Sequence, residues 1–179
     1  ALILALGGCE EVEQMVDRRR PATEYEAYLA GLHEAGLAGT ALTRTWIHQG
    51  GEAIRSPLAV ELPFREEGFI DSNQPDAVGY RVRVERGQVL TVRYRLQSEE
   101  GTRVFLDLLR LPEDPTDPPR PVEADTLTDG LQYEPFRTGD FVVRIQPELL
   151  RGGRYEVLLT LDPALAFPVS GHTMRSIQS

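Results

Sequence analysis

The chain has 179 residues, of which 41% are hydrophobic and 26% are charged, and its formal net charge is -9. This composition is typical of a globular protein, and the length allows one well-buried domain with a small appendage. The acidic balance argues against a nucleic-acid partner, because a surface that binds phosphates needs an excess of positive charge.

Residues 1–9 begin with an apolar run and end at Cys9, the only cysteine, so no intrachain disulfide is possible. The run is far shorter than the roughly 20 residues that span a bilayer, and it matches the end of a signal peptide. Leu6-Gly7-Gly8-Cys9 resembles the lipobox of bacterial lipoproteins. The resemblance implies a lipid on Cys9 and anchoring to a membrane on the periplasmic side of the cell envelope. The alternative is an ordinary secreted protein with an incidental cysteine.

Residues 10–22 are charged and lack an apolar face, so we expect a tether. A helical pair is predicted over residues 23–56. Thr23 and Glu26 have the spacing of a capping box, and Gly36 suits the end of the first helix. The second helix is predicted to begin near Thr40 and to end at Gly50-Gly51. Both helices are too short for a core of their own, so we expect them to pack on one edge or open end of a sandwich, with Trp46 as the main anchor.

Residues 57–163 have the two-residue alternation of β-strands. A first strand is predicted over residues 58–64, followed by a polar loop over 66–75 with a possible short strand at 68–70. The stretch 77–96 alternates on both sides of Arg86-Gly87, which predicts a β-hairpin.

Later strands are predicted at 103–111, 122–127, 131–136, 140–146 and 155–161. Residues 112–121 hold five prolines and are expected to form an exposed excursion. Short strands at intervals of about 8 to 12 residues indicate a mainly β fold, an antiparallel β-sandwich preceded by the helical pair.

Several segments of this region resemble bacterial pre-peptidase C-terminal domains, which accompany secreted peptidases. The matching segments are Asp76-Ala77-Val78-Gly79-Tyr80-Arg81-Val82, Glu85-Arg86-Gly87-Gln88-Val89-Leu90-Thr91-Val92, Thr138-Gly139-Asp140-Phe141-Val142-Val143-Arg144-Ile145 and Gly153-Arg154-Tyr155-Glu156-Val157. The resemblance covers roughly residues 67–161 and implies a jelly-roll-like sandwich.

Residues 164–179 contain Leu165-Ala166-Phe167-Pro168-Val169-Ser170-Gly171, which resembles the segment that leads into LytM/lysostaphin-type zinc metallopeptidase domains. This implies a linker toward a downstream peptidase domain in the same chain, which would hold the zinc. The chain itself would then be a non-catalytic accessory domain that positions an endopeptidase acting on peptidoglycan or its peptides.

The sequence assigns no catalytic residue, metal ligand or cofactor to these 179 residues. His172 lacks the aspartate four positions on that the zinc motif of that family requires. His48 and Glu52 have the spacing of helical metal ligands, but solvated helix-end groups are the better interpretation. Asp71, Asn73 and Asp76 could offer oxygen ligands to calcium, against the alternative of hydrogen bonds within the loop.

A second hypothesis is a stand-alone carbohydrate- or protein-binding lipoprotein. Its sugar platform would come from the strand aromatics, although most of them fit the alternation of a core. The set comprises Tyr80, Tyr94, Phe105, Tyr133, Phe136 and Tyr155.

Overall fold

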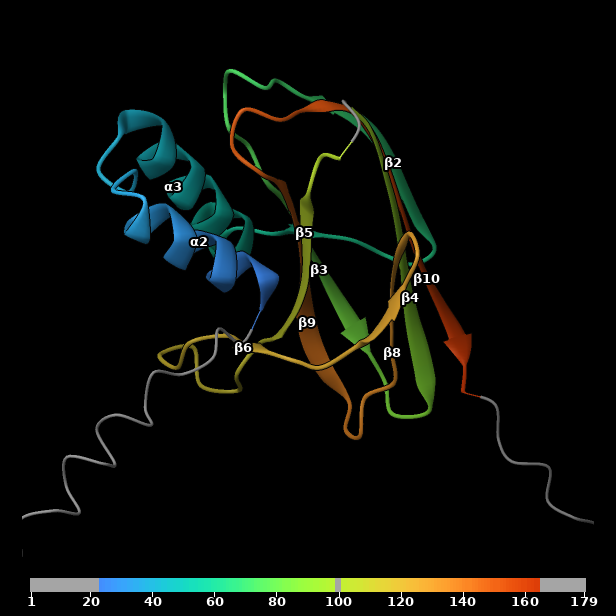
Figure 1. Cartoon of the computed structure of the whole chain (residues 1–179). Coiled ribbons are helices and arrows are strands. Elements are labelled where there is room, and N and C mark those ends of the chain that lie inside the picture. The colour runs from blue at the N-terminus through green and yellow to red at the C-terminus, as the bar shows by residue number, and fades with distance from the viewer. Residues whose placement is uncertain (1–22, 99–100, 165–179) are drawn as a thin grey trace, which may run out of the picture.

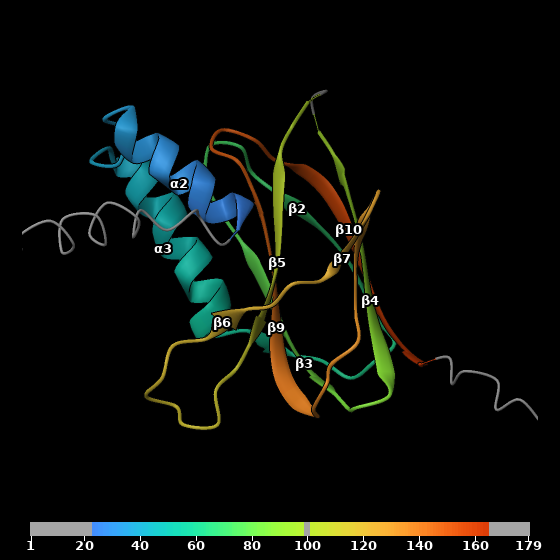
Figure 2. The ribbon, with the colours of Figure 1, turned by 60° about the horizontal axis from the view of Figure 1, so that its bottom comes forward.

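The structure, a computed structural model, describes residues 23–98 and 101–164. These residues form three layers, with a pair of helices on one side of a β-sandwich of two five-stranded sheets (Figures 1 and 2). The expected fold, a mainly β sandwich with a preceding helical pair, is therefore confirmed. No helix of the described ranges combines the length and the apolar character needed to cross a membrane.

The two sheets are named here A and B. Sheet A contains, in spatial order, β1 (Leu58–Ala59), β3 (Val78–Val84), β9 (Gly139–Pro147), β5 (Val104–Arg110) and β6 (Arg120–Pro121). Sheet B contains β2 (Phe64–Ile70), β10 (Gly153–Pro163), β4 (Gln88–Gln97), β8 (Gly130–Tyr133) and β7 (Asp125–Leu127). All pairings are antiparallel except the short parallel contact of β1 with β3.

The order of the long strands is that of a jelly roll. From β2 to β5 each strand lies in the sheet opposite its predecessor, and the later strands β9 and β10 are inserted between β3 and β5 and between β2 and β4. The apolar sides of both sheets meet in one core, built around Tyr80, Val92, Phe141, Ile145 and Leu159. The jelly-roll character implied by the sequence is confirmed.

The predicted β-hairpin over residues 77–96 is wrong in its pairing. Both strands form and Gly87 has a positive φ of 84°, but β3 pairs with β1 and β9 whereas β4 pairs with β10 and β8. The connection thus arches between the sheets. A glycine turn between two alternating strands serves an arch as well as a hairpin, so the local pattern does not decide the partner.

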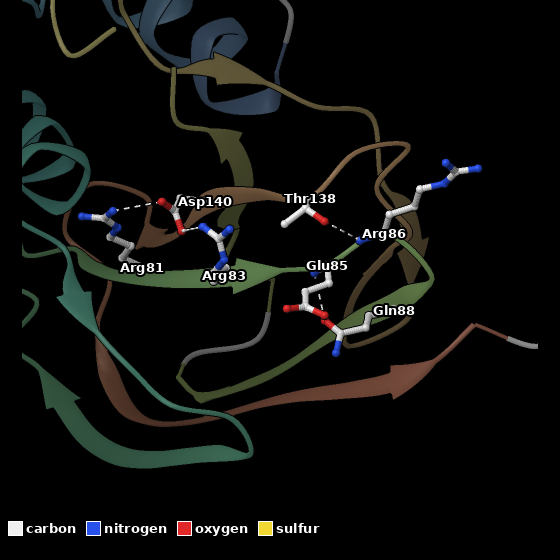
Figure 3. A network of polar contacts seen from close by, with 7 residues as sticks. All are labelled: Arg81, Arg83, Glu85, Arg86, Gln88, Thr138 and Asp140. Atoms are coloured by element: carbon white, nitrogen blue, oxygen red, sulfur yellow. Dashed lines mark hydrogen bonds and ion pairs between the residues drawn. The ribbon is translucent and has the colours of Figure 1, made fainter. Parts of the chain in front are cut away.

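Polar contacts fix this arch at both ends (Figure 3). The backbone N–H of Glu85 donates to the Gln88 side chain over 2.9 Å, and the N–H of Arg86 donates to the Thr138 hydroxyl over 3.0 Å. Beside the arch, Asp140 on β9 accepts from Arg81 of β3 at 3.0 Å. The arch is therefore anchored to the loop that precedes β9.

The segment 58–70 also differs from the prediction. The expected strand over residues 58–64 is divided, because β1 belongs to sheet A and β2 begins at Phe64 in sheet B. Residues 66–70 of the expected loop over 66–75 belong to β2, which includes the possible short strand at 68–70, and residues 71–75 are loop. Glu66 and Gly68 occupy inward positions of β2, where the pattern lacks apolar side chains, and the Glu66 carboxylate accepts a hydrogen bond of 2.5 Å from the Tyr155 hydroxyl. The hydrogen bond from the Tyr155 hydroxyl thus satisfies the inward Glu66 carboxylate at a position where an apolar side chain would be expected.

The other predicted strands are present. β5, β9 and β10 follow the predicted ranges closely, and the weaker predictions correspond to β7 and β8. The proline-rich segment is exposed over most of its length, and only its last two residues join sheet A, as the edge strand β6.

Both helices begin where the sequence predicts. The Thr23 hydroxyl accepts from the Glu26 N–H at the start of α2 (Glu24–Glu34), and Thr40 caps α3 (Ala41–Arg55) in the same way. Gly36 has the positive φ expected after α2. The predicted end of the second helix at Gly50-Gly51 is wrong, because α3 continues to Arg55.

The helical pair was predicted to pack on an edge or open end of the sandwich. It covers the outer face of sheet A instead. There α3 contacts β3 and β9 and α2 contacts β5 (Figure 2). Glycines allow this close approach. A Cβ at Gly79 of β3 would lie 1.8 Å from the Ala53 carbonyl oxygen, and one at Gly50 would lie 2.4 Å from the Gln146 side chain. The Gly50 position therefore serves packing and does not end the helix.

We predict that Gly79→Ala lowers the free energy of unfolding by about 1–3 kcal/mol or more, because backbone on both sides of the contact must move. Gly31→Ala is the matched control, since a Cβ there meets nothing within 4 Å. This control should raise stability by about 0.5–1 kcal/mol, through the better helix propensity of alanine. Urea unfolding of both variants measures the difference. Equal effects would contradict the close contact of α3 with β3.

Candidate binding cleft

An ion pair buried between the helices and sheet A determines how the helical layer is placed. Asp107 on β5 and Arg144 on β9 are cross-strand partners, and both side chains are 7% exposed. The guanidinium donates to one carboxylate oxygen from Nη2 at 2.5 Å and from Nε at 3.1 Å. Two charges at this depth are stable only when they are paired, so the helices must cover them without separating them.

Aromatic rings of the helices and of β5 provide that cover. The Arg144 guanidinium lies 3.5 Å from the centre of the Tyr25 ring, which is a close cation–π contact. Tyr25 stacks on Trp46 with ring centres 4.8 Å apart, and Phe105 of β5 meets both rings edge-on. Burial raises the pKa of the Tyr25 hydroxyl, and the nearby Arg144 cation offsets only part of that effect.

Hydrogen bonds add specificity to this contact. The Trp46 indole donates to the Pro147 carbonyl over 2.8 Å, and the Gln146 side chain donates to the Trp46 carbonyl over 2.8 Å. The Tyr28 hydroxyl accepts from the N–H of Leu149 at 3.2 Å. Trp46 is 1% exposed, so the prediction that it anchors the helical pair is confirmed.

The placement of α2 brings its first residues to the mouth of a cleft of about 450 Å³. The cleft lies between β5 of sheet A and the β7–β8 pair of sheet B, which are on the same side of the sandwich (Figure 2). Its volume falls within the range of ligand sites, about 300–1,000 Å³. Aliphatic side chains line it, namely Val104, Leu106, Leu108, Val122, Leu127 and Leu131, and polar groups of Thr23, Glu24, Thr126 and Thr128 border it.

Tyr94 of β4 contributes a buried hydroxyl to this region. Its ring packs against the core and lines the cleft, yet its hydroxyl is enclosed and has no hydrogen-bond partner among the described residues. Burial raises the pKa of this hydroxyl well above the ordinary value for tyrosine. Tyr155 differs, because burial and its hydrogen bond to Glu66 raise its pKa to about 12 while its hydroxyl is satisfied.

The helical metal pair considered from the sequence is occupied by other contacts. His48 Nε2 lies 3.9 Å from the Glu52 carboxylate, but Arg55 donates to the same carboxylate oxygen over 2.5 and 3.0 Å. No three His, Cys, Asp or Glu side chains of residues 23–98 and 101–164 gather as a metal site would require. The zinc implied by the family resemblance therefore has no fitting ligand set in this part of the chain.

The calcium candidates form hydrogen bonds within their loop. The Asp71 carboxylate accepts from the Asn73 backbone N–H at 2.8 Å, and the Asp76 carboxylate accepts from the Ala77 N–H at 2.8 Å. This is the alternative that the sequence offered against a calcium site.

The strand aromatics belong mainly to the core. Of the six considered for a sugar platform, Tyr80, Phe105 and Tyr155 are buried, Tyr94 and Tyr133 are half-buried, and Phe136 alone is exposed, at 92%. A flat platform needs several exposed rings, so this set does not form one.

Cys9, His172 and the Phe167-Pro168-Val169 segment lie outside the described residues, and the predictions made on them stand as predictions. Sequence reasoning missed Asp107 and Arg144, and it named Tyr94 only among the aromatics of a possible sugar platform. A signal was present for the first two, because an acid and a base interrupt largely apolar strands at outward positions. The buried, unpartnered hydroxyl of Tyr94 gave no signal, since its alternation is that of any core residue.

We predict that Asp107→Leu costs about 3–5 kcal/mol of stability, because it leaves the Arg144 cation buried without its partner. Combining it with Arg144→Leu should recover most of the loss, since no isolated charge is then left. Urea unfolding of the single and double variants measures this. The exposed pair of Arg65 with Glu156 is the control, and Glu156→Gln should cost less than about 1 kcal/mol. A double variant as unstable as the sum of the single changes would contradict the prediction.

Two tyrosine variants should change the stability of the fold in different ways. Tyr94→Phe removes an unpartnered buried hydroxyl and should leave stability unchanged or raise it by about 1 kcal/mol or more. Tyr155→Phe removes a hydroxyl that donates to a carboxylate and should lower stability by about 1.5–3 kcal/mol. Thermal unfolding of both variants is the measurement. A clear loss of stability in Tyr94→Phe would show that its hydroxyl is satisfied.

Comparisons with known proteins do not assign a family to this chain. No protein-family model and no curated protein matches the chain. Among solved structures it is similar to the pre-peptidase C-terminal domain of a collagenase from Bacillus anthracis, at 13% identity and a TM-score of 0.43, over 60% of this chain and 95% of that one. It is also similar to PliG, a periplasmic inhibitor of g-type lysozyme. The Aeromonas hydrophila protein has 13% identity and a TM-score of 0.40, over 59% of this chain and 96% of that one. The Salmonella Typhimurium protein has 18% identity and a TM-score of 0.38, over 59% of this chain and 97% of that one. Because these three TM-scores are below 0.5, the jelly-roll assignment rests on the strand order itself.

Proposed function

We propose that this chain is a non-catalytic module of the cell envelope that holds a peptidoglycan-directed zinc endopeptidase in a set position relative to the membrane. The proposal combines the lipobox resemblance at Cys9, the Phe167-Pro168-Val169 segment that resembles the lead-in to such a peptidase, and the three-layered architecture between them.

The observation that carries the proposal is the fixed path of the chain through three layers. The chain enters at Thr23, in the helical layer, and leaves sheet B at Ala164, after β10 (Figure 1). The helical layer is fixed to sheet A by the Asp107–Arg144 pair and its aromatic cover. At the other end, the N–H of Ala164 donates to the Gly87 carbonyl over 2.8 Å. A tether and a following domain would thus be held on opposite layers of one folded unit.

The membrane partner in this proposal is reached through a lipid on Cys9. Two or more acyl chains give stable anchoring, whereas a single chain gives only marginal binding. The charged residues 10–22 then act as the tether, and peptidoglycan or its peptides are the material on which the downstream domain acts.

A second candidate function is a binding β-sandwich that acts without an attached enzyme. The cleft beside β5 favours it, because a module that served only as a spacer needs no apolar cavity between its sheets. The residues that follow Ser179 separate the two candidates.

The first test is the gene sequence after Ser179. We expect a domain that contains a histidine separated by three residues from an aspartate, the first zinc-binding motif of the family. A stop codon directly after Ser179, or a domain without this motif, would refute the proposal. Mass spectrometry of the membrane fraction should also find a lipid on Cys9, and Cys9→Ser should release the protein from that fraction.

The second test uses the full-length enzyme and separates positioning from catalysis. Asp107→Leu loosens the helical layer and should slow digestion of intact cell walls by the anchored enzyme severalfold, while cleavage of a soluble peptide substrate stays unchanged. Glu156→Gln, on the exposed face of sheet B, is the control and should change neither rate. Equal loss of both activities in Asp107→Leu would indicate a general folding defect and would count against a positioning role.

A further inference from the structure

The edge of β5 is open where it borders the cleft. One side of the strand pairs with β9 along its whole length, but on the other side β6 pairs only with Leu109 and Arg110. The Leu108 carbonyl accepts from Val122 N–H at 3.0 Å, so even-numbered residues of β5 direct their backbone groups away from β9. Within the described part of the chain, no backbone group bonds to the N–H or carbonyl of Val104 and Leu106.

We propose that the cleft binds a short extended peptide, which adds to sheet A as a strand along this open edge. Unpaired backbone groups of an edge strand are a template for a further strand, and peptide recognition by strand addition obtains affinity from the backbone and specificity from alternate side chains. The peptide continues the position that β6 begins. This inference goes beyond the proposed function, and it does not require a downstream peptidase.

The dimensions of the open edge limit the peptide to a few paired residues. The edge runs from Val104 to Asp107, and β6 closes it at Leu109. Four residues of strand span about 13 Å at roughly 3.3 Å each. The cleft volume of about 450 Å³ leaves room for side chains of moderate size between the sheets.

The lining specifies the chemistry of the peptide. Side chains of successive residues in a strand point to opposite faces. One set would enter the space between the sheets, among Val104, Leu106 and Leu131, where aliphatic groups fit. The other set would point outward, past the start of α2.

The charge around the cleft determines which side chains the peptide can carry on its outward face. Glu24 lines the cleft at the start of α2, and a further exposed acid, Glu123, lies between the lining residues Val122 and Ala124. Neither carboxylate has an ion-pair partner within the residues described, and the whole chain has a net charge of -9. The occupant is therefore a peptide of alternating aliphatic and basic residues.

Binding is tested on the full chain with a blocked hexapeptide of alternating valine and arginine, by isothermal titration calorimetry. We expect saturable one-to-one binding. The same peptide with N-methyl groups on the residues that pair with β5 cannot donate hydrogen bonds to the edge, and it should bind at least tenfold more weakly. A peptide with glutamate in place of arginine should also lose at least tenfold. Equal binding of the methylated and unmethylated peptides would overturn the proposal.

Amide hydrogen exchange locates the peptide without any variant. The amides of Val104 and Leu106 should gain protection when the peptide is bound, whereas those of Phe105 and Asp107, which already face β9, should change little. Protection spread over other surfaces, with none at Val104 and Leu106, would show that the peptide binds elsewhere and would refute the site.

A pair of variants adds a steric test. Thr126→Trp places a large side chain at the exposed border of the cleft and should weaken hexapeptide binding at least tenfold. Thr160→Trp, on the outer face of sheet B, is the matched control and should bind as the unaltered protein does. Circular dichroism confirms that both variants fold. Unchanged binding by a folded Thr126→Trp would exclude the cleft, and it would leave the proposed positioning role untouched.

Discussion

The buried pair of Asp107 and Arg144 is the constraint on which the arrangement of the molecule depends. Its charges lie on the outer face of sheet A, and an unpaired or uncovered arrangement there would be costly, so the face requires a lid with both apolar area and a favourable electrostatic surface. Tyr25 and Trp46 supply both. This requirement fixes α2 over β5, and the position of α2 in turn shapes the mouth of the cleft. Sheet B needs no such cover, because its outward residues form exposed ion pairs such as Arg65 with Glu156.

Local sequence patterns predicted the elements better than their partners. Alternation located most strands, and the capping residues Thr23 and Thr40 placed both helix starts, because these features depend on neighbours in the chain. Pairing does not, and the Arg86-Gly87 turn was assigned to a hairpin although it joins two sheets. The Gly50-Gly51 stop signal failed for a related reason, since packing of Gly50 against Tyr25 and Gln146 outweighs its weak helix propensity.

The cleft could not have been predicted from the sequence, because its walls come from segments far apart in the chain. Leu106, Leu131 and Tyr94 each alternate as ordinary core residues, and only the jelly-roll order sets them around one space. The open stretch of β5 depends on how far β6 extends, which two residues of a proline-rich segment decide. By contrast, Asp107 and Arg144 interrupt apolar strands in a way that is visible in the sequence, but the helices were still expected at an edge or open end of the sandwich.

Pro121 has a consequence for how copies of the protein behave when they are crowded side by side. It sits in the edge strand of sheet A, where it has no N–H to offer, and the strand is only two residues long. Along these two residues the border offers a neighbouring molecule no run of donors and acceptors, so strand addition at this edge is confined to the short open stretch from Val104 to Asp107 of β5. So short a stretch gives neighbouring copies little on which to extend a continuous intermolecular sheet, which favours separate particles over fibrous aggregates.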